Sequence, residues 1–147
     1  MPLACRELRL RVNLVQTWVD TPLLPVAWGE VFDKLTILAI KQDKIADANK
    51  LANVAKEFEA ISAIVGDFSQ YPDGLVDLYA DLKAINLRLW DVEDGKRACE
   101  RAQSFGDDFV ALAREVYFGN DKRAVIKRQI NELLGSALVE EKSYKAY

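Results

Sequence analysis

The chain contains no histidine and only two cysteines, and these absences exclude whole classes of chemistry. Without an imidazole there can be no Ser-His-Asp or Cys-His nucleophile and no histidine metal ligand. Cys5 and Cys99 are single residues far apart, so they cannot build a structural zinc site on their own. Any acid–base chemistry would therefore fall to Asp, Glu, Lys, Tyr or Cys side chains.

Long apolar runs and an excess of positive charge are also missing. No apolar stretch approaches the roughly 18 to 20 residues that are needed to span a bilayer. The net charge of −3 does not fit a nucleic-acid binder, which is usually basic. Isolated cysteines in a chain without a visible secretory leader are typical of a reducing compartment, so we expect a cytoplasmic protein.

The 147 residues, half of them hydrophobic and 29% charged, fit one globular domain with its own core. Residues 7–14 alternate strictly between apolar and polar side chains, which is the period of a β-strand. Residues 23–28 could supply a second short strand. A lone hairpin is only marginally stable. We therefore treat residues 1–22 as an N-terminal extension and residues 23–147 as a helical domain with a loose C-terminal tail.

Apolar residues at helical spacing predict the rest of the fold. The expected helices cover residues 28–45, 47–66, 74–104 and 107–135. Asp47 is the expected N-cap of the second helix, and Gly66 its expected end. Gly119-Asn120-Asp121 could break the last helix into two. The expected fold class is thus all-α, an antiparallel bundle of four or five helices with a small N-terminal β strand or hairpin appendage.

Polar side chains interrupt the apolar faces of the last two predicted helices. They are Asn86, Glu93 and Arg97 on one helix, and Asn120, Arg123, Lys127 and Asn131 on the other. Burying such groups is costly unless they meet partners or a ligand. If the two faces meet, cations outnumber the single carboxylate, and this suits a ligand with carboxylate or phosphate groups. An internal network, with Glu93 paired to Arg97 and Arg123, or a polar dimer seam would use the same residues.

Several blocks of the sequence resemble a small family of uncharacterised, mostly bacterial proteins. The blocks are Gly29-Glu30, residues 33–38, Ile40-Lys41, Lys50-Leu51, Asn53, Asn86, Leu89-Trp90, Glu93-Asp94, Asn120-Asp121, Lys127, Ile130-Asn131, Gly135-Ser136 and residues 140–144. The resemblance implies a domain of unknown function, loosely associated with cell-surface polysaccharide genes, and brings no catalytic residue. Its motifs contain most of the interrupting polar positions, and they add Glu30, Lys34 and Lys41 to the candidate ligand-binding residues.

From these features we favour a homodimeric binding or accessory module, without catalysis or a cofactor, whose polar residues hold a small anionic ligand. A sugar phosphate or nucleotide sugar is the ligand that the resemblance suggests. A metal-assisted hydrolase is the alternative, because Glu30 with Asp33 and Asp91 with Asp94 have the i, i+3 spacing that could hold a divalent cation. A purely structural oligomerisation domain is a third possibility.

Replacement of Lys127 separates these interpretations. An open anion site predicts that Lys127→Ala melts within a few degrees of the wild type and loses any stabilisation by phosphate or sulfate. An internal network predicts a loss of roughly 3 to 5 kcal/mol, because a buried partner is left without its counter-charge.

Overall fold

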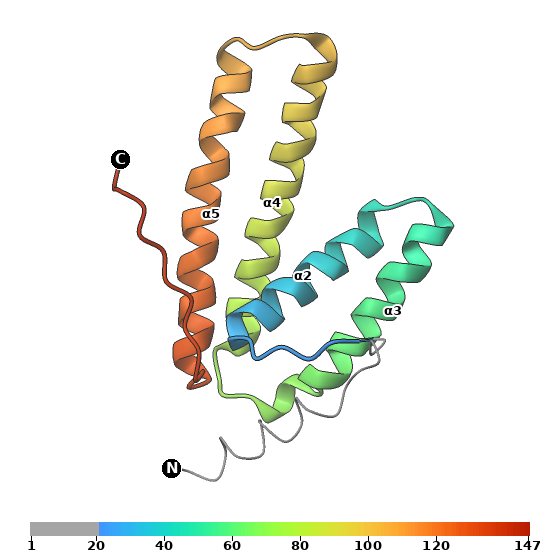
Figure 1. Ribbon diagram of the computed structural model, residues 1–147, viewed down its shortest axis with the longest axis vertical. Coiled ribbons are helices and arrows are strands. Elements are labelled where there is room, and N and C mark those ends of the chain that lie inside the picture. The colour runs from blue at the N-terminus through green and yellow to red at the C-terminus, as the bar shows by residue number, and fades with distance from the viewer. Residues whose placement is uncertain (1–20) are drawn as a thin grey trace, which may run out of the picture.

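The structure, a computed structural model, describes residues 21–147 and is helical throughout its regular part. The elements follow the order α2 (Trp28–Lys44), α3 (Ala48–Val65), the short 3-10 helix η1 (Phe68–Gln70), α4 (Leu75–Ala102) and α5 (Asp107–Leu133). Figure 1 shows two antiparallel hairpins, α2–α3 and α4–α5, of which the second extends well beyond the first. The predicted all-α bundle is confirmed for these residues. The predicted strand at residues 7–14 lies outside them.

The ends of α3 follow the local signals in the sequence. The Asp47 side chain accepts a hydrogen bond from the Lys50 backbone N–H at 2.9 Å, as an N-cap does. Gly66 ends the helix with a φ of 69°, a conformation that glycine adopts without strain. Both predictions for this helix are confirmed.

Two possibilities that the sequence left open, a second strand and a break in the last helix, are not realised. Residues 22–27 form neither strand nor helix, and Trp28 already belongs to α2. The last helix does not break, because α5 runs without interruption through Gly119, Asn120 and Asp121. Gly119 serves close packing instead, since a Cβ there would lie 2.7 Å from Cδ2 of Leu89 on α4.

The core lies where the two hairpins meet, and Phe32 of α2 is at its centre. Its ring is fully buried, and the ring centroids of Trp28, Phe68, Tyr71 and Tyr79 lie 5.7 to 6.3 Å from its own. Most of these pairs are edge-to-face, a geometry that stabilises aromatic clusters beyond the area they bury. This packing fixes the first turns of α2 against η1 and α4.

After α5 the chain reverses and runs back beside that helix (Figure 1). Gly135 has a φ of 60°, and the Ser136 N–H donates to the Asn131 carbonyl at 2.8 Å, which closes the end of the helix. The tail, residues 136–147, then has no helix or strand.

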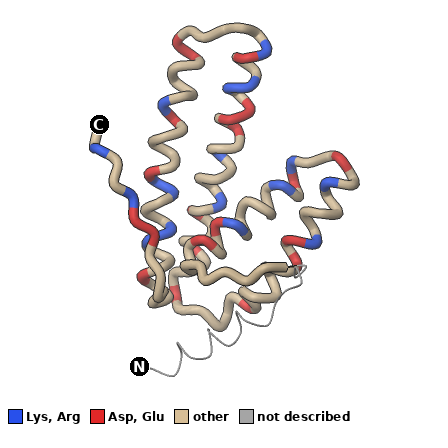
Figure 2. The backbone as a smooth tube through the Cα atoms, in the orientation of Figure 1, with Lys and Arg blue, Asp and Glu red and all other residues tan. Residues whose placement is uncertain are grey.

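Charged residues of both signs are spread over the helices and the tail (Figure 2). In the described part of the chain no helix combines the length and the apolar character that crossing a membrane requires.

Candidate functional site

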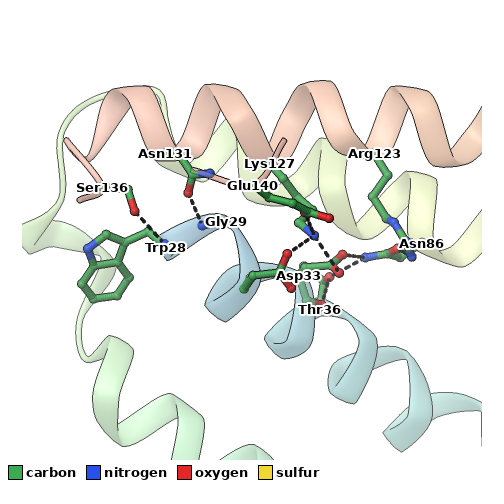
Figure 3. A network of polar contacts seen from close by, with 11 residues as sticks. Trp28, Gly29, Asp33, Thr36, Asn86, Arg123, Lys127, Asn131, Ser136 and Glu140 are labelled. Carbon is green, nitrogen blue, oxygen red and sulfur yellow. Dashed lines mark hydrogen bonds and ion pairs between the residues drawn. The ribbon is translucent and has the colours of Figure 1, made fainter. Parts of the chain in front are cut away.

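Lys127 of α5 is the centre of the polar residues between the helices (Figure 3). Its side chain is 11% exposed, and its Nζ donates to the carboxylates of Glu30 and Glu140, the second at 3.1 Å. Oδ2 of Asp33 lies 3.9 Å from the same nitrogen. One ammonium thus meets three carboxylates, two from α2 and one from the tail. The sequence led us to expect the opposite balance, with cations in excess.

These contacts keep Lys127 charged. Burial alone would lower the pKa of Lys127, but the hydrogen bonds with Glu30 and Glu140 and the charge of Asp33 outweigh burial and raise that pKa above its ordinary value of 10.5. The hydrogen bond from Lys127 is the main reason that the pKa of Glu140 lies below its ordinary value of 4.5. Both shifts mean that folding favours the ionised pair.

The stability that this pair contributes is expected to stay constant between about pH 5 and pH 10. Because the pKa of Lys127 is raised, its contribution is complete below the ordinary lysine pKa and is lost as the pH rises through the higher folded value. Because the pKa of Glu140 is lowered, its contribution is complete above the ordinary carboxyl pKa and is lost as the pH falls through the lower folded value. Urea unfolding across the pH range measures the loss of stability at acid and at alkaline pH. Glu140→Gln should reduce the loss at acid pH. A large stability change between pH 6 and 8 would contradict this assignment.

A second group of polar contacts joins α2 to α4 and α5 through Asn86. The Asn86 amide donates to Oδ1 of Asp33 at 2.8 Å and to Oγ1 of Thr36 at 2.9 Å. Arg123 of α5 donates to Oδ1 of Asn86 at 3.4 Å. Asp33, Thr36 and Asn86 are all buried, and within residues 21–147 every buried polar side-chain atom has a hydrogen-bond partner. The interior of the site is therefore a satisfied network.

The N-terminus of α2 receives its caps from the other end of the chain. Its own N-cap residue, Ala27, has no side chain that can accept a hydrogen bond. Oδ1 of Asn131 instead accepts from the Gly29 N–H at 2.7 Å, and Oγ of Ser136 accepts from the Trp28 N–H at 3.2 Å. These bonds satisfy backbone donors that the first turn of any helix leaves free.

Of the residues predicted from sequence, five meet around α2 and α5: Glu30, Asn86, Arg123, Lys127 and Asn131. Others do not join them. Glu93 pairs with Arg97 at 3.0 Å and with Lys96 at 3.2 Å on the surface of α4, so the predicted Glu93–Arg97 pair forms without Arg123.

The remaining candidates also lie apart from the network. Lys34 forms an exposed ion pair with Glu57 at 2.6 Å. Within the described chain, Lys41 and Asn120 make no hydrogen bond or ion pair with the network. For the metal alternative, Glu30 and Asp33 do lie near one another, but the positive charge beside them is the ammonium group of Lys127. Asp91 pairs with Lys44 at 3.0 Å. Within residues 21–147 no three acidic or cysteine side chains, those of Asp91 and Asp94 included, are arranged so that they could hold a metal ion.

Four residues of the network were not among the ligand-binding candidates, and one of them, Asp33, was considered only for the metal alternative. Thr36 lies one turn after Asp33. Its position among apolar residues was the only sequence feature that could have indicated a buried polar contact. Ser136 and Glu140 occur in the blocks that carry the family resemblance, but nothing in the helical period points to the tail. Their role depends on the chain reversal at Gly135, which brings the tail beside α5.

A hollow of about 260 Å³ lies between α5 and the tail, next to this network. Its charged lining consists of Lys127, Arg128 and Lys142, with Glu140 as the single carboxylate. Arg128 also pairs with Glu141 at 2.9 Å, whereas Lys142 forms no ion pair with any described residue. The hollow is thus lined by positively charged hydrogen-bond donors, which lie beside the Glu140 carboxylate of the tail.

Arg and Lys donors beside an open space are suited to carboxylate and phosphate oxygens. Asn131 also lines the hollow, and its amide nitrogen is left for another acceptor because its oxygen already serves Gly29. The resemblance to a bacterial family stays a prediction. Comparisons of the chain with protein-family models, with curated proteins and with solved structures found no match.

Proposed function

We propose that this chain is a binding module that takes a small anionic group, a phosphate or a carboxylate, in the hollow between α5 and the tail. The observation that carries the proposal is Lys142, which lines the hollow without an ion pair among the described residues. It lies beside Lys127 and Arg128, whose partners Glu140 and Glu141 belong to the tail. Charge-assisted hydrogen bonds from such groups are roughly twice as strong as neutral ones. The Asn131 amide nitrogen would add a neutral donor.

The size of the hollow bears on the ligand. At about 260 Å³ it is smaller than the roughly 300 to 1,000 Å³ of pockets that enclose drug-sized ligands. It therefore suits one anionic group better than a whole nucleotide. A sugar phosphate would place its phosphate in the hollow and its sugar outside, and a nucleotide sugar would extend far beyond it.

Substitution of Lys142 tests the proposal without disturbing the buried network. Inorganic phosphate is expected to raise the melting temperature of the wild type more than sodium chloride of equal ionic strength. Saturation at about 100 times the dissociation constant corresponds to about 2.7 kcal/mol. Lys142→Glu should lose most of this shift, because it replaces a rim cation with an anion.

Lys145→Glu is the matched control, since it makes the same charge change on the same tail outside the lining of the hollow. It should retain the phosphate shift. Equal losses in the two variants would mean that phosphate acts only through net charge, and the proposal would fail. No phosphate shift in the wild type would also refute it.

Other functions stay separate proposals. A metal-assisted hydrolase gains no support from the arrangement of Glu30, Asp33 and Lys127, whose charges satisfy one another. The predicted homodimer stays a prediction, and exposed apolar side chains of α5 outside the hollow, such as Val110, are where its interface should be sought. Analytical ultracentrifugation over a range of concentrations measures the oligomeric state directly.

A further inference from the structure

Side chains of the tail contact α5 at two places, which we call the first and the second fastening. Glu140 and Glu141 pair with the consecutive cations Lys127 and Arg128, at 3.1 and 2.9 Å. Six residues after Glu141, the Tyr147 hydroxyl donates to Oδ2 of Asp121 at 2.5 Å. The residues between these fastenings have no helix or strand.

Aromatic contacts strengthen the second fastening. The Tyr147 ring lies 5.1 Å from the ring of Tyr117 and 4.9 Å from that of Phe118, between ring centroids. Both α5 rings remain about 40% exposed, at 41% and 38%, so the tail covers this aromatic pair only in part. Contacts of this kind hold a segment in place and can be broken without unfolding the helix beneath.

Among the three carboxylates that meet Lys127, that of Glu140 is the one whose backbone lies outside the helices of the core. Glu30 and Asp33 belong to α2, whose position is fixed by Phe32 and by the caps from α5. Glu140 lies on the tail, and its side chain is 45% exposed. Glu140 lines the hollow, and its carboxylate is an anionic group like those proposed for the ligand. Figure 3 shows Glu140 beside Lys127.

We infer that the tail is a displaceable strap, in which Glu140 occupies the place of the ligand's anionic group at Lys127. This inference rests on the proposed function. An anion that binds Lys127 and Arg128 competes with Glu140 and Glu141 together, because both cations line the hollow. Binding then breaks the ion pairs of Glu140 and Glu141 with α5. It thereby lowers the free energy needed to move Tyr147 away from Tyr117 and Phe118.

The first experiment measures phosphate affinity by NMR titration of the full chain. Glu140→Gln removes the competing charge and keeps the size of the side chain, so phosphate should bind up to about fivefold more tightly, as expected for a partly exposed ion pair. Glu115→Gln is the matched control. It makes the same charge change in another partly exposed ion pair, with Arg88, away from the hollow, and should leave the affinity unchanged.

The second experiment follows the strap itself. Protein labelled with 3-fluorotyrosine reports the Tyr147 environment by ¹⁹F NMR, and Tyr147→Phe assigns the resonance. Phosphate is expected to move this resonance toward the position it has in an unfolded chain, whereas chloride of equal ionic strength should not. Tyr147→Ala, which frees the strap without a change of charge, should also tighten phosphate binding.

The outcomes separate the two proposals. If neither the wild type nor Glu140→Gln binds phosphate, the proposed function is refuted and the strap with it. If both bind with equal affinity and the Tyr147 resonance does not move, the anion site stands and the strap is refuted. Tighter binding in Glu140→Gln together with a phosphate-dependent Tyr147 shift supports the inference.

Discussion

Replacing Lys127 with methionine is expected to lower the free energy of unfolding by about 2 to 4 kcal/mol. The substitution leaves Asp33, which is 8% exposed, without its cation. Breaking a buried ion pair from one side costs roughly 3 to 5 kcal/mol. The loss should fall somewhat below that range, because Glu30 and Glu140 are partly exposed and can regain water.

Urea unfolding of the variant measures this loss, and Lys122→Met, an exposed change on the same helix, is the control. The control should change stability by less than about 0.5 kcal/mol. The expectation for Lys127 differs from the sequence-based one, which gave a melting temperature within a few degrees of the wild type. The sequence-based expectation depends on an open cleft with surplus positive charge. A loss below about 1 kcal/mol would restore it.

Substitution of Gly29 is expected to be nearly as damaging, for a purely steric reason. A Cβ at this position would lie 2.7 Å from the Lys127 carbonyl oxygen and 3.1 Å from Oδ1 of Asn131. Both belong to the face of α5 on which α2 rests, and the first is backbone, which cannot turn aside. Overpacking of this kind costs typically 1 to 3 kcal/mol, and we expect about 2 to 3 kcal/mol for Gly29→Ala.

Gly95→Ala is the matched control, because Gly95 also lies within a helix. Its added methyl group would meet only the end of the Leu112 side chain, at 3.1 Å, and that side chain can move. The control should be neutral or slightly stabilising, since alanine favours helix by about 1 kcal/mol over glycine. Thermal and urea unfolding of both variants measure the difference. Equal stabilities would show that α2 and α5 are not in the close contact described.

The helices were predictable because their apolar residues recur with the helical period over long stretches. Asn86, Lys127 and Asn131 were identified for the same reason, since a polar residue in an apolar stripe must be paired if the stripe is covered. Glu93 follows the same period, but its ion-pair partners Lys96 and Arg97 are on its own helix. Its side chain is 41% exposed and pairs locally with Arg97.

The sign of the charge around Lys127 could not be predicted from the period. Glu30 and Asp33 occur on a helix whose orientation toward α5 is set by tertiary packing around Phe32. Asp33 is buried, although the sequence suggested for it only the role of a possible metal ligand. Glu140 reaches the site only because the chain reverses at Gly135. Pairing between distant elements is the information that a one-dimensional pattern lacks.

The caps of α2 also determine when the start of this helix can acquire its hydrogen bonds during protein synthesis. The acceptors for the Gly29 and Trp28 N–H groups are 102 and 108 residues farther along the chain. At roughly 5 to 20 residues per second, the ribosome adds them about 5 to 20 s after the first turn of α2 has been made. Until then that helix start can bond only to water, and the core around Phe32 lacks Ile130, its fully buried α5 member. The final assembly of the domain therefore waits for its C-terminal end.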